Sequence, residues 1–155
     1  MQNIELLAPA GDDICLRAAI ANGANAVYLG LQEFNARMRA ENFTVHNIGP
    51  VVDYAHEHGV KVYMTVNTLI RNNEIKRLMD TVTAAVKAGV DAYLVQDFGT
   101  LAILKKCFPG INIHASTQMT ITGVHGASLL QKMGAERIVP ARELSLSEIK
   151  EIKEK

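Results

Sequence analysis

The sequence predicts an α/β protein with six β/α units of a parallel, TIM-like (β/α) barrel that is incomplete. Short apolar segments alternate along the 155 residues with segments whose apolar residues repeat at helical spacing. Each helical segment ends in a glycine, followed by a small or branched apolar residue and a strand, as at residues 23–27, 59–63, 89–93, 110–114 and 134–138. Such short returns are typical of parallel strands joined by right-handed crossovers.

The expected elements follow from this pattern. Strands are expected at residues 4–7, 25–30, 60–66, 92–96, 111–115 and 137–139. Helices are expected at residues 12–21, 44–58, 74–87, 101–107 and 121–133, with a last helix from Ser145 onward. Asp12 or Asp13 caps the first helix, a Gly-Pro pair at 49–50 interrupts the second, and Ser145 with Glu148 forms a capping box for the last. Residues 31–43 lack an apolar period and are expected to form a long loop.

Alternation within the strands favours a barrel over the alternative, a doubly wound open sheet. Residues 111–116 alternate apolar side chains with Asn112, His114 and Ser116, and residues 60–67 alternate in the same way. A sheet covered by helices on both faces has near-continuous apolar strands, whereas a barrel accepts polar groups inside. An eight-unit barrel usually has about 250 residues. We therefore expect residues 1–155 to be one N-terminal barrel domain of a longer protein, with its open strand edges covered in a homo-oligomer.

Composition restricts the class of partner. Sixteen basic residues balance sixteen acidic ones, so the chain as a whole has no electrostatic attraction to nucleic acid or to an anionic membrane, although a local basic site remains compatible with it. Cys15 and Cys107 form no Cys-x-x-Cys or Cys/His cluster and are expected to be free thiols. The sequence contains no signal peptide and no long apolar run, so we expect a cytoplasmic protein without a membrane partner.

Candidate functional residues follow the strands, because ligands bind at the carboxyl ends of parallel strands. Gln96 and Asp97 end the segment DAYLVQDFG, where Asp97 could instead cap the next helix. Arg37 and Arg39 lie in the long loop and suit carboxylate or phosphate, the alternative being a surface salt bridge. We assign as candidate catalytic residues Asp97, His114, Arg142 and Glu143, and as candidate substrate-binding residues Arg37, Asn67, Gln96, Ser116 and Gln118.

Several of these assignments have structural alternatives. Asn67 could satisfy loop backbone, and Arg142 and Glu143 could pair with neighbours. His114 has no visible acidic partner, and a lone histidine in a strand is more often structural than catalytic. His56 and His58, two residues apart, point in different directions on a helix and predict no metal site. Phosphate-binding glycine motifs, GxSxG and HExxH are absent, so no nucleophile with a base is visible.

Seven segments resemble the collagenase-like peptidases of unassigned catalytic type, peptidase family U32. They are ELLAPAGD (5–12), GANAVYLG (23–30), FNARMRAENF (34–43), AHEHGVKVYMTVNT (55–68), GVDAYLVQDFG (89–99), HASTQMTI (114–121) and ARELSLSEI (141–149). They occur in the family's order and cover nearly the whole chain. The resemblance implies a barrel-type N-terminal domain, in agreement with the strand alternation.

For function, the resemblance implies a peptidase, a hydrolase acting on peptides. Some family members are instead implicated in oxygen-independent hydroxylation of tRNA or rRNA bases, or of a quinone precursor, a small aromatic substrate. In those members an iron–sulfur cluster is held by cysteines that follow the Ala-Arg-Glu-Leu motif. Cys15 and Cys107 match none of these positions, so we expect no cofactor in this chain, which ends before that segment. The remaining alternative is an inert fragment that only oligomerises.

Overall fold

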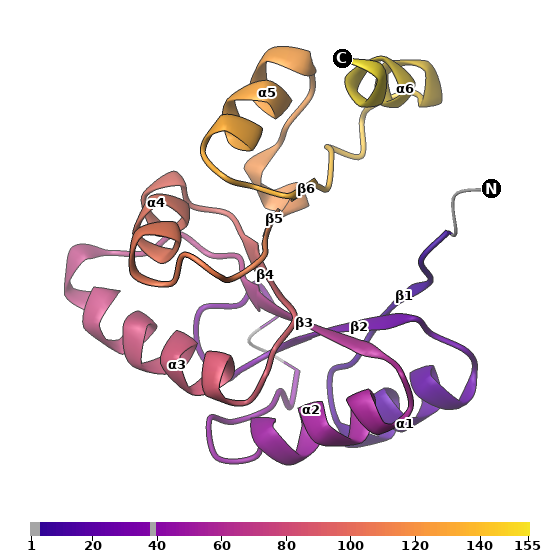
Figure 1. The fold of residues 1–155 in the computed structure, drawn as a ribbon, viewed down its shortest axis with the longest axis vertical. Helices are drawn as coiled ribbons and strands as arrows, with labels where there is room; N and C mark the ends of the chain where they lie inside the picture. Colours follow the sequence, from indigo (N-terminus) through magenta and orange to yellow (C-terminus); the bar gives the residue numbers. More distant parts are fainter. Residues whose placement is uncertain (1–3, 38–39) are drawn as a thin grey trace.

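The computed structural model describes residues 4–37 and 40–155. Six parallel strands form one sheet, in which each strand pairs with the next along the chain: β1 (Leu7–Pro9), β2 (Ala26–Gly30), β3 (Lys61–Val66), β4 (Ala92–Val95), β5 (Ile113–Ala115) and β6 (Arg137–Ile138). The sheet curls into a half-barrel with helices along its outer side (Figure 1). The predicted fold class, an incomplete TIM-like barrel, is confirmed.

Six α-helices are found among the described residues: α1 (Asp13–Ala21), α2 (Ile48–Glu57), α3 (Ile75–Lys87), α4 (Phe98–Cys107), α5 (Val124–Lys132) and α6 (Leu146–Glu154). Two 3₁₀ turns, η1 (Asn72–Glu74) and η2 (Thr117–Met119), precede α3 and α5. The expected caps are confirmed, since the Asp12 carboxylate accepts a hydrogen bond from the Cys15 N–H and Ser145 forms a capping box with Glu148. Except at the start of α2, the observed boundaries lie within three residues of the predicted ones.

The prediction for the first strand was wrong in position. β1 begins at Leu7, whose partner in β2 is Ala26, rather than at residue 4. The side chain of Ile4 is 93% exposed, and Leu6 is exposed as well. A short apolar run indicated a strand, but pairing with β2 decides where that strand lies. Glu5, which lies just before β1, forms an ion pair with Arg137 of β6 at the other edge of the sheet.

The prediction for the second helix was also wrong at its start. Thr44 and Asn47 form a turn in which the Thr44 N–H donates to Asn47 Oδ1 over 2.7 Å, so that α2 begins only at Ile48. Pro50 does not interrupt the helix. It lies in the first turn, where a backbone N–H has no partner within the helix and its loss has no cost.

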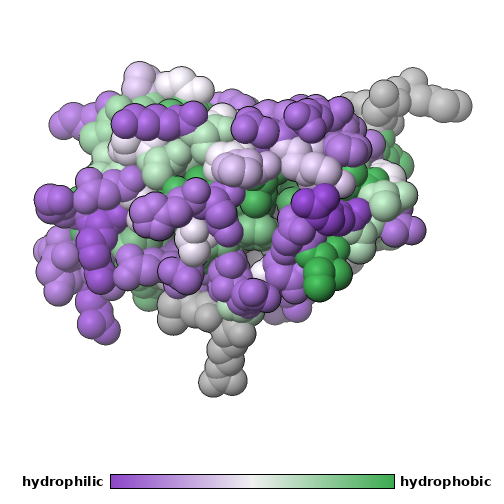
Figure 2. Space-filling model, turned by 90° about the horizontal axis from the view of Figure 1, so that it is seen from below, coloured by the Kyte–Doolittle hydropathy of each residue, from purple (hydrophilic) through white to green (hydrophobic). Residues whose placement is uncertain are grey.

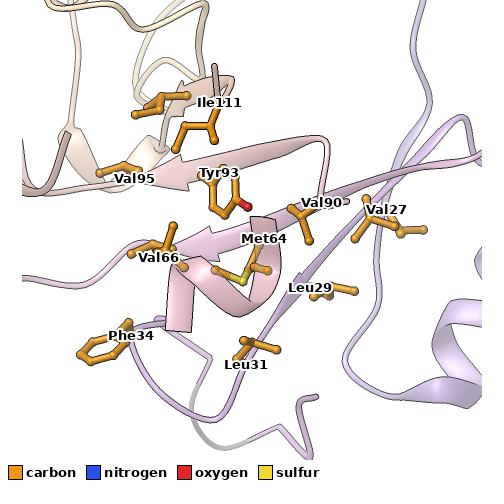
Figure 3. Packing of buried hydrophobic residues seen from close by; sticks show 14 of the residues in the cluster. Val27, Leu29, Leu31, Phe34, Met64, Val66, Val90, Tyr93, Val95 and Ile111 are labelled. Carbon is orange, nitrogen blue, oxygen red and sulfur yellow. The ribbon is translucent and has the colours of Figure 1, made fainter. Parts of the chain in front are cut away.

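The two faces of the sheet have different surroundings, as the alternation predicts. Val62, Met64 and Val66 of β3 belong to a large apolar cluster that also contains helix residues, part of which is drawn in Figure 3. Tyr63 belongs to a second, smaller buried cluster, made only of strand residues: Ala26, Tyr63, Ala92 and Leu94. Helices therefore cover the outer face, while the inner face lines the hollow of the half-barrel.

The face of the molecule seen from below is mainly polar. Figure 2 shows the molecule from below, where hydrophilic side chains cover most of the face and hydrophobic ones are visible between them. Among the described residues, no helix has both the length and the apolar content needed to cross a membrane.

Candidate functional site

A cavity of about 460 Å³ lies at the carboxyl ends of the strands, inside the half-barrel. We call it the mouth cavity. Its lining comes from all six β/α units and includes five of the predicted site residues, together with Tyr28: Arg37, Asn67, Ser116, Gln118 and Arg142. The fold thus brings together side chains that are more than 100 residues apart in the sequence.

Tyr28, an inward-facing residue of β2, contacts the Arg37 side chain at this cavity. Arg37 Nη2 donates a hydrogen bond of 2.6 Å to Tyr28 Oη, and the guanidinium carbon lies 4.9 Å from the centre of the tyrosine ring. The hydrogen bond and the cation–π contact both orient the planar guanidinium. Tyr28 was missed by the sequence reasoning, although alternation along NAVYLG places it on the same side of the strand as Gly30.

Three asparagine side chains hold the backbone that carries Arg37. Asn35 is 1% exposed, and its Oδ1 accepts a hydrogen bond of 2.7 Å from the Arg37 N–H. Asn42 Nδ2 donates to the Arg37 carbonyl over 3.0 Å. Asn67 Oδ1 accepts from the Ala36 N–H over 2.9 Å. Asn35 and Asn42 were missed by the sequence reasoning, because a loop without periodicity gives no signal for which polar side chains turn back onto the backbone.

The opposite side of the mouth cavity is formed by the segment after β5. The buried Ser116 hydroxyl accepts hydrogen bonds from the Gln118 N–H over 3.3 Å and from Asn67 Nδ2 over 3.5 Å. Arg142 follows β6 and is exposed, with its side chain at the edge of the cavity. Asn67 therefore contacts both loops that flank the cavity.

The charge of the mouth cavity has one sign. Among its described lining residues, Arg37 and Arg142 are charged, and there is no Asp, Glu, His, Lys or Cys. Two guanidinium groups in a cavity that no described carboxylate lines favour an anionic ligand, such as a phosphate or carboxylate. The remaining polar groups are amides, hydroxyls and one tyrosine, which bind and orient a ligand but are weak acids and bases.

Other predicted site residues lie outside this cavity. Asp97 caps α4, since its Oδ1 accepts a hydrogen bond of 2.7 Å from the Thr100 N–H, as the structural alternative predicts. Gln96 is partly buried after β4, and Glu143 is exposed beside Arg142; neither is among the lining residues. Arg39 lies outside the described residues.

His114 lies on the inner face of β5, but at a floor cavity of about 240 Å³ that Lys61 and Arg137 also line. It is 7% exposed and meets the Tyr63 ring edge-on, with 4.9 Å between ring centroids. Burial, and then the positive charge of Arg137, lower the pKa of His114 to about 4. The imidazole is therefore neutral near pH 7, and the structure places it away from the mouth cavity.

A polar network lies beside His114 at the amino ends of the strands, which we call the floor of the half-barrel. Glu5 forms an ion pair of 2.5 Å with Arg137 and accepts a hydrogen bond of 2.8 Å from the Tyr63 hydroxyl. Burial, and then the hydrogen bond to Glu5, raise the pKa of Tyr63 to about 12, so this hydroxyl remains a donor. We call Glu5, Tyr63 and Arg137 the floor network. The sequence reasoning missed it, because nothing in a sequence pairs residues 132 positions apart.

The cysteines do not form a cofactor site. Cys15 lies in the first turn of α1 and Cys107 is the last residue of α4, and both are exposed. The hydrogen bond with Asp12 raises the pKa of the Cys15 thiol, which disfavours the thiolate that a metal requires. Within the described part of the chain, no group of three or more His, Cys, Asp or Glu side chains could hold a metal ion. These residues do not fit the four-thiolate ligand set of an iron–sulfur cluster.

Comparison with known proteins identifies the family of the chain and supports its fold. The family model described as "Peptidase family U32" matches residues 11–155. The chain belongs to peptidase family U32. The solved structure of the U32 peptidase Mk0906 superposes with a TM-score of 0.80 at 15% identity, covering 98% of this chain and 65% of that one, which supports the barrel fold alone.

The relatives of this U32 chain have names of two kinds. It is 41% identical over 154 residues to the "uncharacterized protease MJ0090" of Methanocaldococcus jannaschii. It is 42% identical over 149 residues to the 23S rRNA 5-hydroxycytidine C2501 synthase of Escherichia coli, and 36% identical over 151 residues to tRNA hydroxylation protein P1 of Bacillus subtilis. These matches cover 99%, 96% and 97% of this chain, which spans only 37%, 22% and 36% of the relatives' lengths.

Proposed function

We propose that this chain is part of an enzyme that hydroxylates bases of RNA, and that its mouth cavity binds a segment of the RNA substrate. Two relatives support this proposal by name, one acting on 23S rRNA and one on tRNA. The neutral net charge of the chain is compatible with it, because RNA recognition needs only a local cationic site.

The observation that carries the proposal is the composition of the mouth cavity. The guanidinium groups of Arg37 and Arg142 suit phosphate oxygens, and no described carboxylate lines the cavity to repel them. The side-chain amide of Gln118 matches the donor and acceptor edge of an unpaired base, and Tyr28 offers a ring face. Charge and hydrogen-bonding groups therefore fit a single-stranded nucleotide.

The role assigned to this chain is substrate binding and orientation. Arg37 and Arg142 hold backbone phosphate, the Gln118 amide fixes the base edge within the cavity, and Asn67 holds the loop that carries Arg37. The family resemblance implies an iron–sulfur cluster, which would supply redox chemistry, but the thiols of Cys15 and Cys107 do not fit its ligand set. We therefore assign no redox step to residues of this chain.

Proteolysis is the second candidate, supported by the relative named as a protease. In that case Arg37 would bind a carboxylate of the peptide. Peptide hydrolysis also needs an activated nucleophile or water. Ser116 and Thr65 have buried hydroxyls at the mouth cavity. The partners of Ser116, Asn67 Nδ2 and the Gln118 N–H, are donors, and the Thr65 hydroxyl donates to the Leu29 carbonyl, so neither hydroxyl has a base as partner. The described residues thus favour hydroxylation of RNA over hydrolysis of peptides.

Deleting the gene in its own organism tests the proposal. Hydroxylated nucleosides of tRNA and rRNA are quantified by liquid chromatography and mass spectrometry, with wild-type and variant genes reintroduced. We expect one hydroxylated nucleoside to disappear, to return with the wild type, and to stay absent with Arg37→Ala/Arg142→Ala. Lys76→Ala/Lys150→Ala, on the outer helices α3 and α6, is the matched control and should restore it.

Unchanged nucleosides in the deletion strain would contradict the proposal. If the native protein instead cleaves denatured collagen, and Arg37→Ala/Arg142→Ala abolishes that cleavage, the peptidase function replaces it.

A further inference from the structure

The loop between β2 and α2 carries Arg37 into the mouth cavity in a backbone conformation with two unusual residues. Phe34 and Asn42 have φ angles of +64° and +54°, in the left-handed region. Asparagine adopts this region more readily than most residues, whereas a bulky residue such as Phe rarely does. Such conformations persist only where surrounding contacts impose them. Phe34 is buried, and the Asn42 N–H donates to the Gly11 carbonyl over 2.9 Å, so both are held by neighbouring segments.

Among the described residues outside this loop, Asn67 is the one whose side chain hydrogen-bonds to the backbone next to Arg37. It directly follows β3 and is therefore attached to the central part of the sheet. Its Oδ1 accepts from the Ala36 N–H at 2.9 Å, while its Nδ2 reaches Ser116 Oγ at 3.5 Å. A carboxamide offers an acceptor and a donor in one plane, so a single side chain joins the two loops that flank the cavity.

We propose that Asn67 is a positioning residue that acts through Arg37: it holds the β2–α2 loop so that the guanidinium is in place before a ligand arrives. The inference rests on the proposed function only for the identity of that ligand. An exposed arginine loses side-chain and loop freedom when it binds, and a loop fixed beforehand reduces this cost. Loss of Asn67 should weaken binding although Arg37 itself is retained.

Amide hydrogen exchange of the full chain directly tests the hydrogen bond from the Ala36 N–H to Asn67 Oδ1. In Asn67→Ala we expect the Ala36 amide to exchange about five- to tenfold faster, the effect of losing one neutral hydrogen bond. Asn67→Asp retains the acceptor oxygen and should retain protection of Ala36. Asn112→Ala is the matched control. It removes the hydrogen bond from the Asn112 side chain to the Asp91 carbonyl, at the other end of the strands. Unchanged exchange at Ala36 in Asn67→Ala would overturn the proposal.

A binding cycle tests whether Asn67 acts through Arg37. Unfractionated tRNA is titrated against the wild-type chain, Asn67→Ala, Arg37→Ala and the double variant. We expect Asn67→Ala to weaken binding about fivefold, and the double variant to bind no more weakly than Arg37→Ala alone. If the two substitutions weaken tRNA binding independently, so that their fold-changes multiply in the double variant, the positioning role is overturned. If the wild-type chain binds no tRNA, the proposed function fails, while the exchange of Ala36 still decides the role of Asn67.

Discussion

Glu5, which precedes the first strand, forms an ion pair with Arg137 of the last described strand, with 2.5 Å between Oε1 and Nη1. The two residues are separated by 132 positions and lie on β/α units at opposite edges of the sheet. The ion pair therefore spans the floor of the half-barrel and links its edges. Burial tends to raise the pKa of the Glu5 carboxyl, but hydrogen bonds from Arg137 and Tyr63 outweigh it, and the pKa is lowered.

This ion pair should stabilise the fold measurably. In a double-mutant cycle of Glu5→Ala and Arg137→Ala, we expect a coupling free energy of about 1 kcal/mol, at the upper end for partly exposed pairs. Urea unfolding provides the measurement. The control cycle uses Lys76 and Asp80, a pair four residues apart on the surface of α3, which should show a smaller coupling. Equal couplings in the two cycles would show that the floor ion pair has no special role.

Protonation of His114 should make stability depend on pH between its unfolded and folded pKa values. The folded pKa is about 4, below the ordinary value of 6.5, so the unfolded chain binds more protons in this window and stability falls as the pH is lowered. From pH 7 to pH 5 the wild type should lose about 2 kcal/mol more than His114→Gln. Urea unfolding at both pH values measures this, and parallel losses would exclude a buried neutral imidazole.

Asp97 should matter for stability and not for ligand binding. Asp97→Ala removes the cap of α4 and should lower the free energy of unfolding by about 1 kcal/mol, whereas Asp97→Ser retains a capping oxygen. Asp12→Ala, which removes the equivalent cap of α1, is the matched control. A large loss of tRNA affinity in Asp97→Ala, without such a loss in Asp12→Ala, would instead return Asp97 to the binding site.

Gly30 leaves space for the asparagine that holds Arg37. A Cβ atom at this position would lie 2.6 Å from Cγ of the buried Asn35, so Gly30→Ala must displace that side chain. We expect a loss of about 1–3 kcal/mol in unfolding free energy and faster amide exchange at Arg37. Gly49→Ala, in the first turn of α2 with no atom within 4 Å of the new Cβ, should be neutral or stabilising. Equal effects of the two substitutions would contradict this role of Gly30.

The parts of the fold that depend on local chemistry could be predicted from the sequence. Gly59 and Gly89 end helices with φ angles of +71° and +84°, and the alternation along β3 correctly predicts which side chains face the helices. The start of β1 could not be predicted in the same way, because it depends on pairing with Ala26. Apolar content alone wrongly suggested that Ile4 lies in the strand.

The candidate site was predictable where the fold itself brings residues together. Arg37, Ser116 and Arg142 follow strands, so a barrel places them at one end whatever their separation in sequence. His114 was placed less well, because strand alternation shows that it points inward but not how far along the hollow it lies. The hydrogen bonds of Asn35 depend on loop conformation, which no sequence period describes.

Salt-dependent tRNA binding most directly tests whether the mouth cavity is an RNA site. The full chain is titrated with unfractionated tRNA at increasing NaCl. We expect Arg37→Ala/Arg142→Ala to bind about tenfold more weakly. The magnitude of the slope of log K against log salt should fall by about 1.5, because two phosphate contacts are lost. Lys76→Ala/Lys150→Ala, with the same change in charge, should keep the wild-type slope. Wild-type affinity and slope in the arginine variant would contradict an RNA site at the mouth cavity.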